Sequence, residues 1–133
     1  MKTSSAKAKG RRCAQEIKEK LLEHWPKYDP AFGGTPLEDD DIIVTPSGVT
    51  GEDIKLSPRA RKAYPFSIEA KNQETAKVWE WIKQAKEHSQ GTNRIPLVVF
   101  KRNHETLKVC LEFDDFLKLL SSNTGHPGLI PQK

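Results

Sequence analysis

The sequence lacks the features that mark zinc-binding, secreted or membrane-spanning proteins. Its two cysteines, Cys13 and Cys110, have no metal-ligand spacing, and each lies among apolar neighbours. We therefore expect both to be reduced, buried thiols in a cytoplasmic protein. No apolar run approaches the roughly 18 residues that a membrane span requires. The basic N-terminal segment leads into no apolar signal core, so we expect neither secretion nor a membrane span.

The length of 133 residues fits one domain with its own core. Hydrophobic residues make up 35% of the chain and charged residues 30%, which is polar but still compatible with folding. The chain has no internal repeat. We expect the domain to occupy residues 1–122. The composition of residues 123–133, rich in Gly and Pro, predicts a flexible tail.

Charge is segregated along the chain, although the net charge is only +4. Residues 1–28 carry a net charge of +5, residues 29–53 carry −7, and residues 54–102 carry +7. Basic segments suit a polyanion such as nucleic acid. The carboxylates between them would repel that polyanion unless a divalent cation neutralised them. The alternative is a solvated acidic loop between solvated helix faces, and charge alone does not separate the two interpretations.

The spacing of apolar residues predicts a mixed α/β domain with a central sheet flanked by helices. Short turns between the first three strands favour an antiparallel meander. The strand at 96–102 is almost continuously apolar, which predicts burial on both faces. The expected elements are a helix over residues 8–25, an irregular loop over 27–41, strands over 41–45, 52–56 and 65–71, a helix over 73–89, strands over 96–102 and 106–113, and a short helix "FLKLL" capped by Asp114 or Asp115.

The segment "PFSIEAK" places Glu69 and Lys71 two residues apart in a strand that otherwise predicts burial. On a strand, residues i and i+2 point to the same face. Asp53 lies on the preceding strand candidate, and antiparallel pairing would place it beside Glu69. Adjacent carboxylates need a proton, an arginine or a metal. Oxygen ligands on a rigid sheet favour Mg²⁺ or Mn²⁺, and a nearby lysine can stabilise charge on a phosphate, so we expect phosphodiester hydrolysis here.

The motifs "GED" and "IEAK" resemble the PD-(D/E)XK nuclease superfamily. That resemblance implies a restriction-endonuclease-like αβββαβ core, with an acid on the second strand and the (D/E)-x-K motif on the third. It covers roughly residues 9 to 120. The segments "KGRRCAQEI", "GEDIKLSPRARKAYPFSIEAKN" and "WIKQA" are similar to short bacteriophage-type members regarded as Holliday-junction resolvases. Glu52 stands where the superfamily name has Pro.

The resemblance implies a metal centre that holds one or two Mg²⁺ ions, or Mn²⁺ in their place. Asp53 and Glu69 match the two acids of the motif. Glu16, on the first helix, matches an additional acidic ligand of several branches, and the Ala70 carbonyl would be a backbone ligand. The alternative for Glu16 is an ordinary helix salt-bridge ladder with its neighbours at i−4 and i+4.

The resemblance also implies the remaining catalytic roles and the substrate. Lys71 would position the attacking water and stabilise the pentavalent phosphate, and Gln84 resembles a glutamine found near the site in some branches. The implied activity is that of a metal-dependent endonuclease on branched DNA. A four-way junction has two-fold symmetry, so we expect a homodimer. The alternatives are a nuclease for linear, nicked or single-stranded DNA, and a DNA-binding module in which the acids are structural.

Basic residues that flank the acidic site in sequence are the expected phosphate contacts, which set affinity without reading bases. Trp79 lies off the apolar stripe that contains Trp81, which indicates a subunit contact, a stacking platform or a partly covered core residue. The four histidines are scattered without ligand spacing, and we expect no role for them. The expected phosphate contacts are Lys9, Arg11, Arg12, Lys55, Arg59, Arg61 and Lys62.

Overall fold

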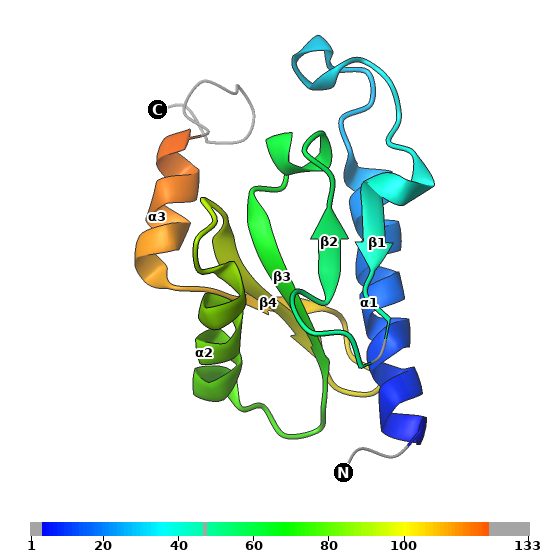
Figure 1. Ribbon diagram of the computed structural model, residues 1–133, viewed down its shortest axis with the longest axis vertical. Helices are drawn as coiled ribbons and strands as arrows, with labels where there is room; N and C mark the ends of the chain where they lie inside the picture. The colour runs from blue at the N-terminus through cyan, green and yellow to red at the C-terminus, as the bar shows by residue number, and fades with distance from the viewer. Residues whose placement is uncertain (1–3, 47, 123–133) are drawn as a thin grey trace.

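A computed structural model describes residues 4–46 and 48–122, and it shows a mixed sheet with α1 on one face and α2 on the other (Figure 1). The predicted order of helix, three strands, helix, two strands and helix is confirmed. The expected tail at 123–133 lies outside the described residues. The elements are α1 (Ser4–His24), β1 (Ile42–Val44), β2 (Ile54–Leu56), β3 (Phe66–Asn72), α2 (Val78–Ser89), β4 (Ile95–Lys101), β5 (Lys108–Cys110) and α3 (Phe113–Ser122), with 3-10 turns η1 (Pro30–Phe32), η2 (Asp39–Asp41) and η3 (Ala60–Lys62).

The sheet has the order β1-β2-β3-β4-β5. Its first three strands form the predicted antiparallel meander. Strands β3 and β4 are parallel, because α2 carries the chain back across the sheet between them, and β5 pairs with β4 antiparallel. This is the α/β arrangement expected of the restriction-endonuclease-like core.

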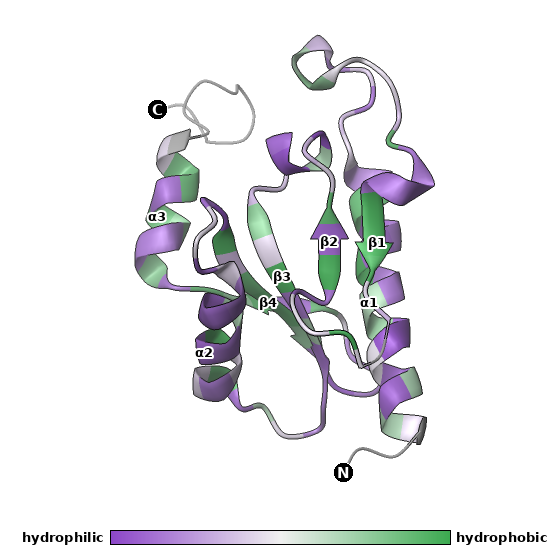
Figure 2. Cartoon of the chain, in the orientation of Figure 1, coloured by the Kyte–Doolittle hydropathy of each residue, from purple (hydrophilic) through white to green (hydrophobic). Residues whose placement is uncertain are grey.

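Two apolar clusters fix the helices on the two faces of the sheet. The stripe of α1 that includes Cys13 and Ile17 packs on the face that carries Ile54 and Ile68. On the opposite face, Trp81 and Ala85 of α2 pack on Val98. Figure 2 shows the apolar character concentrated in the strands between these helices. Strand β4 is buried on both faces, as predicted, because it lies under both clusters.

Several element boundaries differ from the sequence-based expectation. Helix α1 begins at Ser4, four residues early. Helix α2 begins at Val78 rather than at residue 73, because β3 continues to Asn72 and the Gln73 amide still donates to the Lys101 carbonyl, at 3.1 Å. Helix α3 begins at Phe113, so the prediction that Asp114 or Asp115 caps it is wrong, since both lie within the first turn. There their charges favour the helix dipole.

Arg59, an expected phosphate contact, forms hydrogen bonds to the long loop after α1. Its guanidinium donates to the Pro36 carbonyl at 2.9 Å and to both oxygens of Thr35 at 2.6 Å. It also lies 5.5 Å from the centroid of the Trp25 ring. Trp25 is buried and donates through its indole N–H to the same Thr35 carbonyl, at 3.0 Å. Arg59 therefore has a structural position within the loop.

We predict that Arg59→Ala lowers the free energy of unfolding by about 1–3 kcal/mol, because it removes the hydrogen bonds to Thr35 and Pro36 and the guanidinium that packs on Trp25. Urea denaturation followed by Trp fluorescence would measure this. The control is Lys62→Ala, at an exposed position in the same connection between β2 and β3. It should change the free energy of unfolding by less than about 0.5 kcal/mol. Equal stability of the two variants would contradict the structural role of Arg59.

Candidate active site

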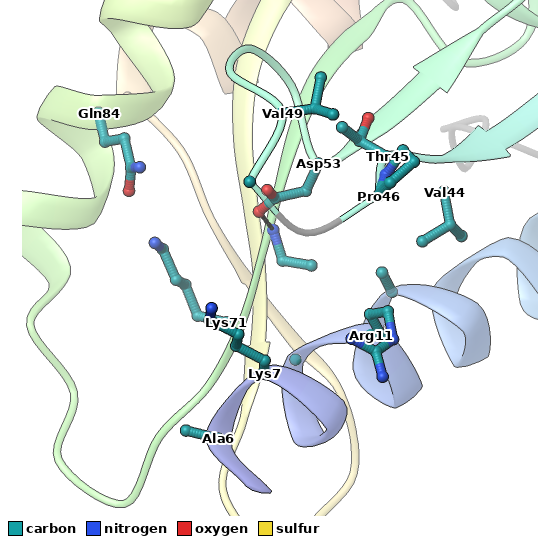
Figure 3. A pocket seen from close by; sticks show the side chains of 14 residues that line it. Ala6, Lys7, Arg11, Val44, Thr45, Pro46, Val49, Asp53, Lys71 and Gln84 are labelled. Atoms are coloured by element: carbon teal, nitrogen blue, oxygen red, sulfur yellow. Dashed lines mark hydrogen bonds between the residues drawn. The ribbon is translucent and has the colours of Figure 1, made fainter. Parts of the chain in front are cut away.

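A cleft of about 240 Å³ lies where β3 extends beyond β2. The pairing of these strands centres on Ile54 opposite Ile68, whereas β3 continues to Asn72. The N-terminal half of α1, the loop between β1 and β2, and one residue of α2 line the remaining sides. The side chains that matter for the chemistry below are those of Lys7, Arg11, Asp53, Lys71 and Gln84, and they are drawn in Figure 3.

Asp53 directly precedes β2 and lies beside Glu69 of β3, near enough for its charge to act on Glu69. The register places Ile54 across from Ile68, and the Asp53 amide donates to the Ile68 carbonyl at 3.2 Å. The Asp53 carboxylate accepts a hydrogen bond from the Ala70 amide of β3, at 2.8 Å. The Asp53 side chain thus pairs with a backbone N–H of β3 that the short strand β2 does not reach. This bond holds the Asp53 carboxylate beside Glu69.

Glu69 is fully buried and does not itself line the cleft. One of its carboxylate oxygens, Oε2, lies 2.7 Å from Nδ1 of His88, and the other, Oε1, has no hydrogen-bond partner among the described residues. Burial, and next the charge of Asp53, raise the pKa of Glu69 to about 7. Contact with His88 and the charge of Lys71 oppose that rise. The mutual repulsion expected of adjacent carboxylates is therefore present.

His88 is a residue that the sequence analysis missed. It lies in the last turn of α2 and contacts Glu69 across 19 residues of sequence. A signal was available, because His88 follows Trp81 by seven residues and Ala85 by three, and so continues the buried stripe of α2 towards the sheet. Lone histidines carry no ligand spacing, which is why the sequence alone suggested no role.

Lys71 and Gln84 approach the cleft from different elements. Lys71 follows Glu69 by two residues on β3 and shares its face, and Gln84 lies on α2. Figure 3 shows the two side chains pointing towards one another. Within the described residues, no hydrogen bond or ion pair engages the Lys71 ammonium, so its charge is available to the cleft. The Lys71 carbonyl accepts a weak hydrogen bond from the buried thiol of Cys13, at 3.7 Å.

Glu16 does not line the cleft. Its carboxylate pairs with Lys101 of β4 at 3.3 Å, whereas α1 presents Lys7, Arg11 and Ala14 to the cleft. Glu16 lies two residues beyond Ala14, which turns its side chain about 200° round the helix. In the part of the chain that the structure describes, no group of three or more His, Cys, Asp or Glu is placed to hold a metal ion.

The residues at the end of β2 nevertheless fit a hard cation with few protein ligands. Asp53 and Glu69 lie close together, Glu69 has a buried oxygen without a hydrogen-bond partner among the described residues, and Ala70 lines the cleft. Mg²⁺ binds in this way, through one or two carboxylates together with several waters. A cation would also relieve the repulsion that raises the pKa of Glu69.

A buried ion pair holds the loop that carries Asp53. Glu52, at the position where the superfamily name has Pro, makes two hydrogen bonds with Arg94, of which Nη2 to Oε1 measures 2.8 Å. Both side chains are largely buried. The Glu52 carbonyl accepts from the Thr45 hydroxyl at 2.6 Å, and the Asp53 carbonyl accepts from the Thr45 amide at 2.9 Å. These contacts restrain the backbone on both sides of Asp53, as a proline would restrain it on one side.

The expected phosphate contacts divide into two groups by position. Arg11 lines the cleft, and Lys55 is exposed on the same face of β2 as Asp53. Lys7 also lines the cleft and was missed by the sequence analysis. Arg12 is exposed on α1.

The remaining basic residues are less favourably placed. Lys9 pairs with Glu74 at 3.8 Å. Arg59, Arg61 and Lys62 lie in the connection between β2 and β3, at the end of the sheet opposite Asp53 and Lys71 (Figure 1). Arg61 there donates to the Leu56 carbonyl at 3.0 Å. Proximity in sequence therefore grouped residues that the fold separates.

Comparison with known proteins identifies a family for the chain. A family model described as "Phage putative PDDEXK endonuclease" matches residues 5–128, which include α1, the whole sheet, α2 and α3. No curated protein and no solved structure matches the chain. Among the described residues, no helix has both the length and the apolar character needed to cross a membrane.

The raised pKa of Glu69 makes folding stability depend on pH. A carboxyl group whose pKa is about 7 in the folded protein and about 4.5 in the unfolded chain destabilises the fold as the pH rises through that interval. We predict that Glu69→Gln removes this loss, so that its stability relative to wild type increases by about 2–3 kcal/mol between pH 5 and pH 8. Urea denaturation at both pH values would measure it. The control is Glu80→Gln, at an exposed position on α2. Its free energy of unfolding should change with pH as that of wild type does.

Proposed function

Because this chain belongs to the phage PDDEXK endonuclease family, we propose that it is a metal-dependent endonuclease that hydrolyses phosphodiester bonds in branched DNA. The observation that carries the proposal is that Asp53, bonded to the Ala70 amide, lies beside Glu69, with Lys71 following on the same face of β3 at a cleft that also contains Lys7. Carboxylates paired in this way, beside a lysine, suit hydrolysis of a phosphate ester.

Asp53, Glu69 and the Ala70 carbonyl are the proposed ligands for Mg²⁺ or Mn²⁺. When bound, the cation would supply Lewis-acid stabilisation of negative charge on the phosphate. The Ala70 amide orients the Asp53 carboxylate, and His88 orients that of Glu69. Glu16 is not among the proposed ligands, because its carboxylate is engaged by Lys101, which already neutralises its charge.

Lys71 and Gln84 are the proposed groups that act on water and phosphate directly. The Lys71 ammonium donates hydrogen bonds to the attacking water and to a phosphate oxygen, on which charge increases in the transition state. Gln84 lies across the cleft and can fix the orientation of the same water without adding charge.

DNA shape, and not base sequence, is the proposed basis of selectivity. Lys7 and Arg11 at the cleft, with Lys55 nearby on β2, supply charge for the phosphate backbone. Such contacts set affinity and register but carry no direct information about bases. A homodimer with two such sites would make the two symmetric nicks that a four-way junction requires. We place the protein in the cytoplasm, where Cys13 and Cys110 remain thiols.

The first test is cleavage of an end-labelled four-way junction beside a matched linear duplex, with Mg²⁺ or with EDTA. We expect paired symmetric nicks in the junction, abolished by EDTA. Asp53→Asn and Lys71→Ala should each reduce the rate by about 100-fold or more, because each removes a group that acts in the transition state. Lys118→Ala, on α3, is the matched lysine control and should cleave at the wild-type rate.

The other outcomes each identify an alternative. Equal cutting of the linear duplex, or cutting of nicked or single-stranded DNA, would keep the nuclease chemistry and refute branched DNA as the substrate. Tight binding without cleavage under any metal, unaffected by Asp53→Asn, would indicate a DNA-binding module whose acids are structural.

We predict that the basic residues at the cleft and those at the far end of the sheet differ in their effect on DNA binding. The double variant Lys7→Ala/Arg11→Ala should weaken junction binding and reduce the slope of log K against log salt by about 2, because each substitution removes one cation that pairs with a phosphate. Fluorescence anisotropy in EDTA at several salt concentrations measures this. The control Arg61→Ala/Lys62→Ala removes the same charge and should leave the slope unchanged; an equal reduction would show that DNA binds at the other end.

A further inference from the structure

Gly10 lies inside helix α1 and lines the cleft. The helix is continuous from Ser4 to His24, so Gly10 has helical residues on both sides. A glycine in this position is less favourable than an alanine, because glycine loses more backbone entropy when the helix forms. A glycine inside a helix generally has a conformational, a packing or a functional reason.

The backbone conformation of Gly10 does not require glycine. The other five described glycines have positive φ angles, between 71° and 107°, and Gly10 does not. Its backbone is right-handed helical, which is the ordinary conformation of residues with side chains. The conformational reason that explains the turn glycines of this chain therefore does not apply to Gly10.

Packing within the described chain does not require glycine at this position either. A Cβ atom added at Gly10 would have no heavy atom within 4 Å, apart from its chain neighbours and the nearby backbone of the same helix. At Gly33, by contrast, an added Cβ would lie 3.7 Å from the guanidinium of Arg59. The space that Gly10 leaves open belongs to the cleft, so a functional reason remains.

Positive charge borders the open space at Gly10. Lys7 precedes Gly10 by three residues, Arg11 follows it directly, and both line the cleft. Residues 4–15 contain four basic residues and no acidic one. Figure 3 shows α1 with Lys7 and Arg11 along one side of the cleft and Asp53 along the other. These surroundings suit a polyanion that approaches the backbone of α1 closely.

We propose that the sugar–phosphate backbone of the DNA substrate passes against Gly10, between Lys7 and Arg11, and that a Cβ atom there would hold the strand away from the cleft. The inference rests on the proposed nuclease function and adds the point at which α1 positions the strand. Lys7 and Arg11 attract phosphates, whereas Gly10 determines how closely the strand approaches Asp53 and Lys71. Glycine is the residue that permits close approach of a ligand to the backbone.

The proposal predicts changes of opposite sign in stability and in DNA binding. Gly10→Ala and Gly10→Leu should stabilise α1, because Ala and Leu have higher helix propensities than glycine and the space for them is open. The melting temperature should rise by about 2–4 °C. The added side chains would occupy the path of the strand, so DNA binding should weaken. A glycine needed only for the fold would give a lower melting temperature when replaced.

The experiment compares wild type, Gly10→Ala and Gly10→Leu in thermal melting and in binding of a four-way junction. Fluorescence anisotropy in EDTA gives the dissociation constant without cleavage. We expect it to rise about 10-fold for Gly10→Ala and further for Gly10→Leu, because the cost of overfilling a close contact increases with the volume added. The slope of log K against log salt should stay at the wild-type value, because no cation is removed.

Cleavage with Mg²⁺ at saturating protein tests positioning separately from affinity. The rate for bound junction should fall about 10-fold or more in Gly10→Leu, because the bound strand lies farther from Asp53 and Lys71. The matched control is Gln15→Leu, which adds a leucine to an exposed position of α1 that does not line the cleft. It should bind and cleave as wild type does. Equal losses in Gln15→Leu and Gly10→Leu would overturn the specific role of Gly10.

Failure of this inference is distinguishable from failure of the proposed nuclease function. If wild type neither binds nor cuts DNA, both are overturned. If wild type binds and cuts DNA, and both Gly10 variants do so with unchanged dissociation constants and rates, only the role of Gly10 is overturned. A lower melting temperature in Gly10→Ala would also overturn it, because Gly10 would then serve the fold itself.

Discussion

The register between β2 and β3 is the constraint on which the rest of the site depends. Because Ile54 pairs with Ile68, Asp53, which directly precedes Ile54, comes beside Glu69, and Lys71 lies on the same face of β3 as Glu69. A slip of one residue would turn Glu69 and Lys71 into the apolar cluster under α1. Ile54 and Ile68 stabilise that register, because both are fully or almost fully buried against α1. Packing on the α1 face of the sheet therefore determines which charged side chains lie together on the opposite face.

Holding two carboxylates together has an electrostatic cost, and the surrounding contacts show how the fold tolerates it. The Ala70 amide bonds Asp53, His88 bonds Glu69, and Arg94 neutralises Glu52 next to Asp53. These partners come from β3, from the end of α2 and from the segment before β4. Three separate parts of the chain therefore contact the acids near the start of β2. The pKa of Glu69 remains raised in spite of this. A site that keeps such repulsion is typical of one that binds a cation or shares a proton.

The sequence predicts what depends on local periodicity and fails where contacts join distant segments. Strand alternation placed Glu69 and Lys71 on one face of β3, and helical spacing identified the buried stripes of α1 and α2. The contacts of His88 with Glu69, of Arg94 with Glu52 and of Lys101 with Glu16 join residues 19, 42 and 85 positions apart. No local pattern encodes these pairings. Arg59 shows the same limit, because a basic residue near an acidic motif has the same appearance in sequence whether it binds a phosphate or two loop carbonyls.

The bond between the Thr45 hydroxyl and the Glu52 carbonyl closes the β1–β2 connection at its base, where it leaves the sheet. Pro46 and Val49 lie beyond that closure and line the cleft. Substitutions at these two positions would therefore alter what the cleft admits, while the bonds of Thr45 to Glu52 and Asp53 keep Asp53 in place.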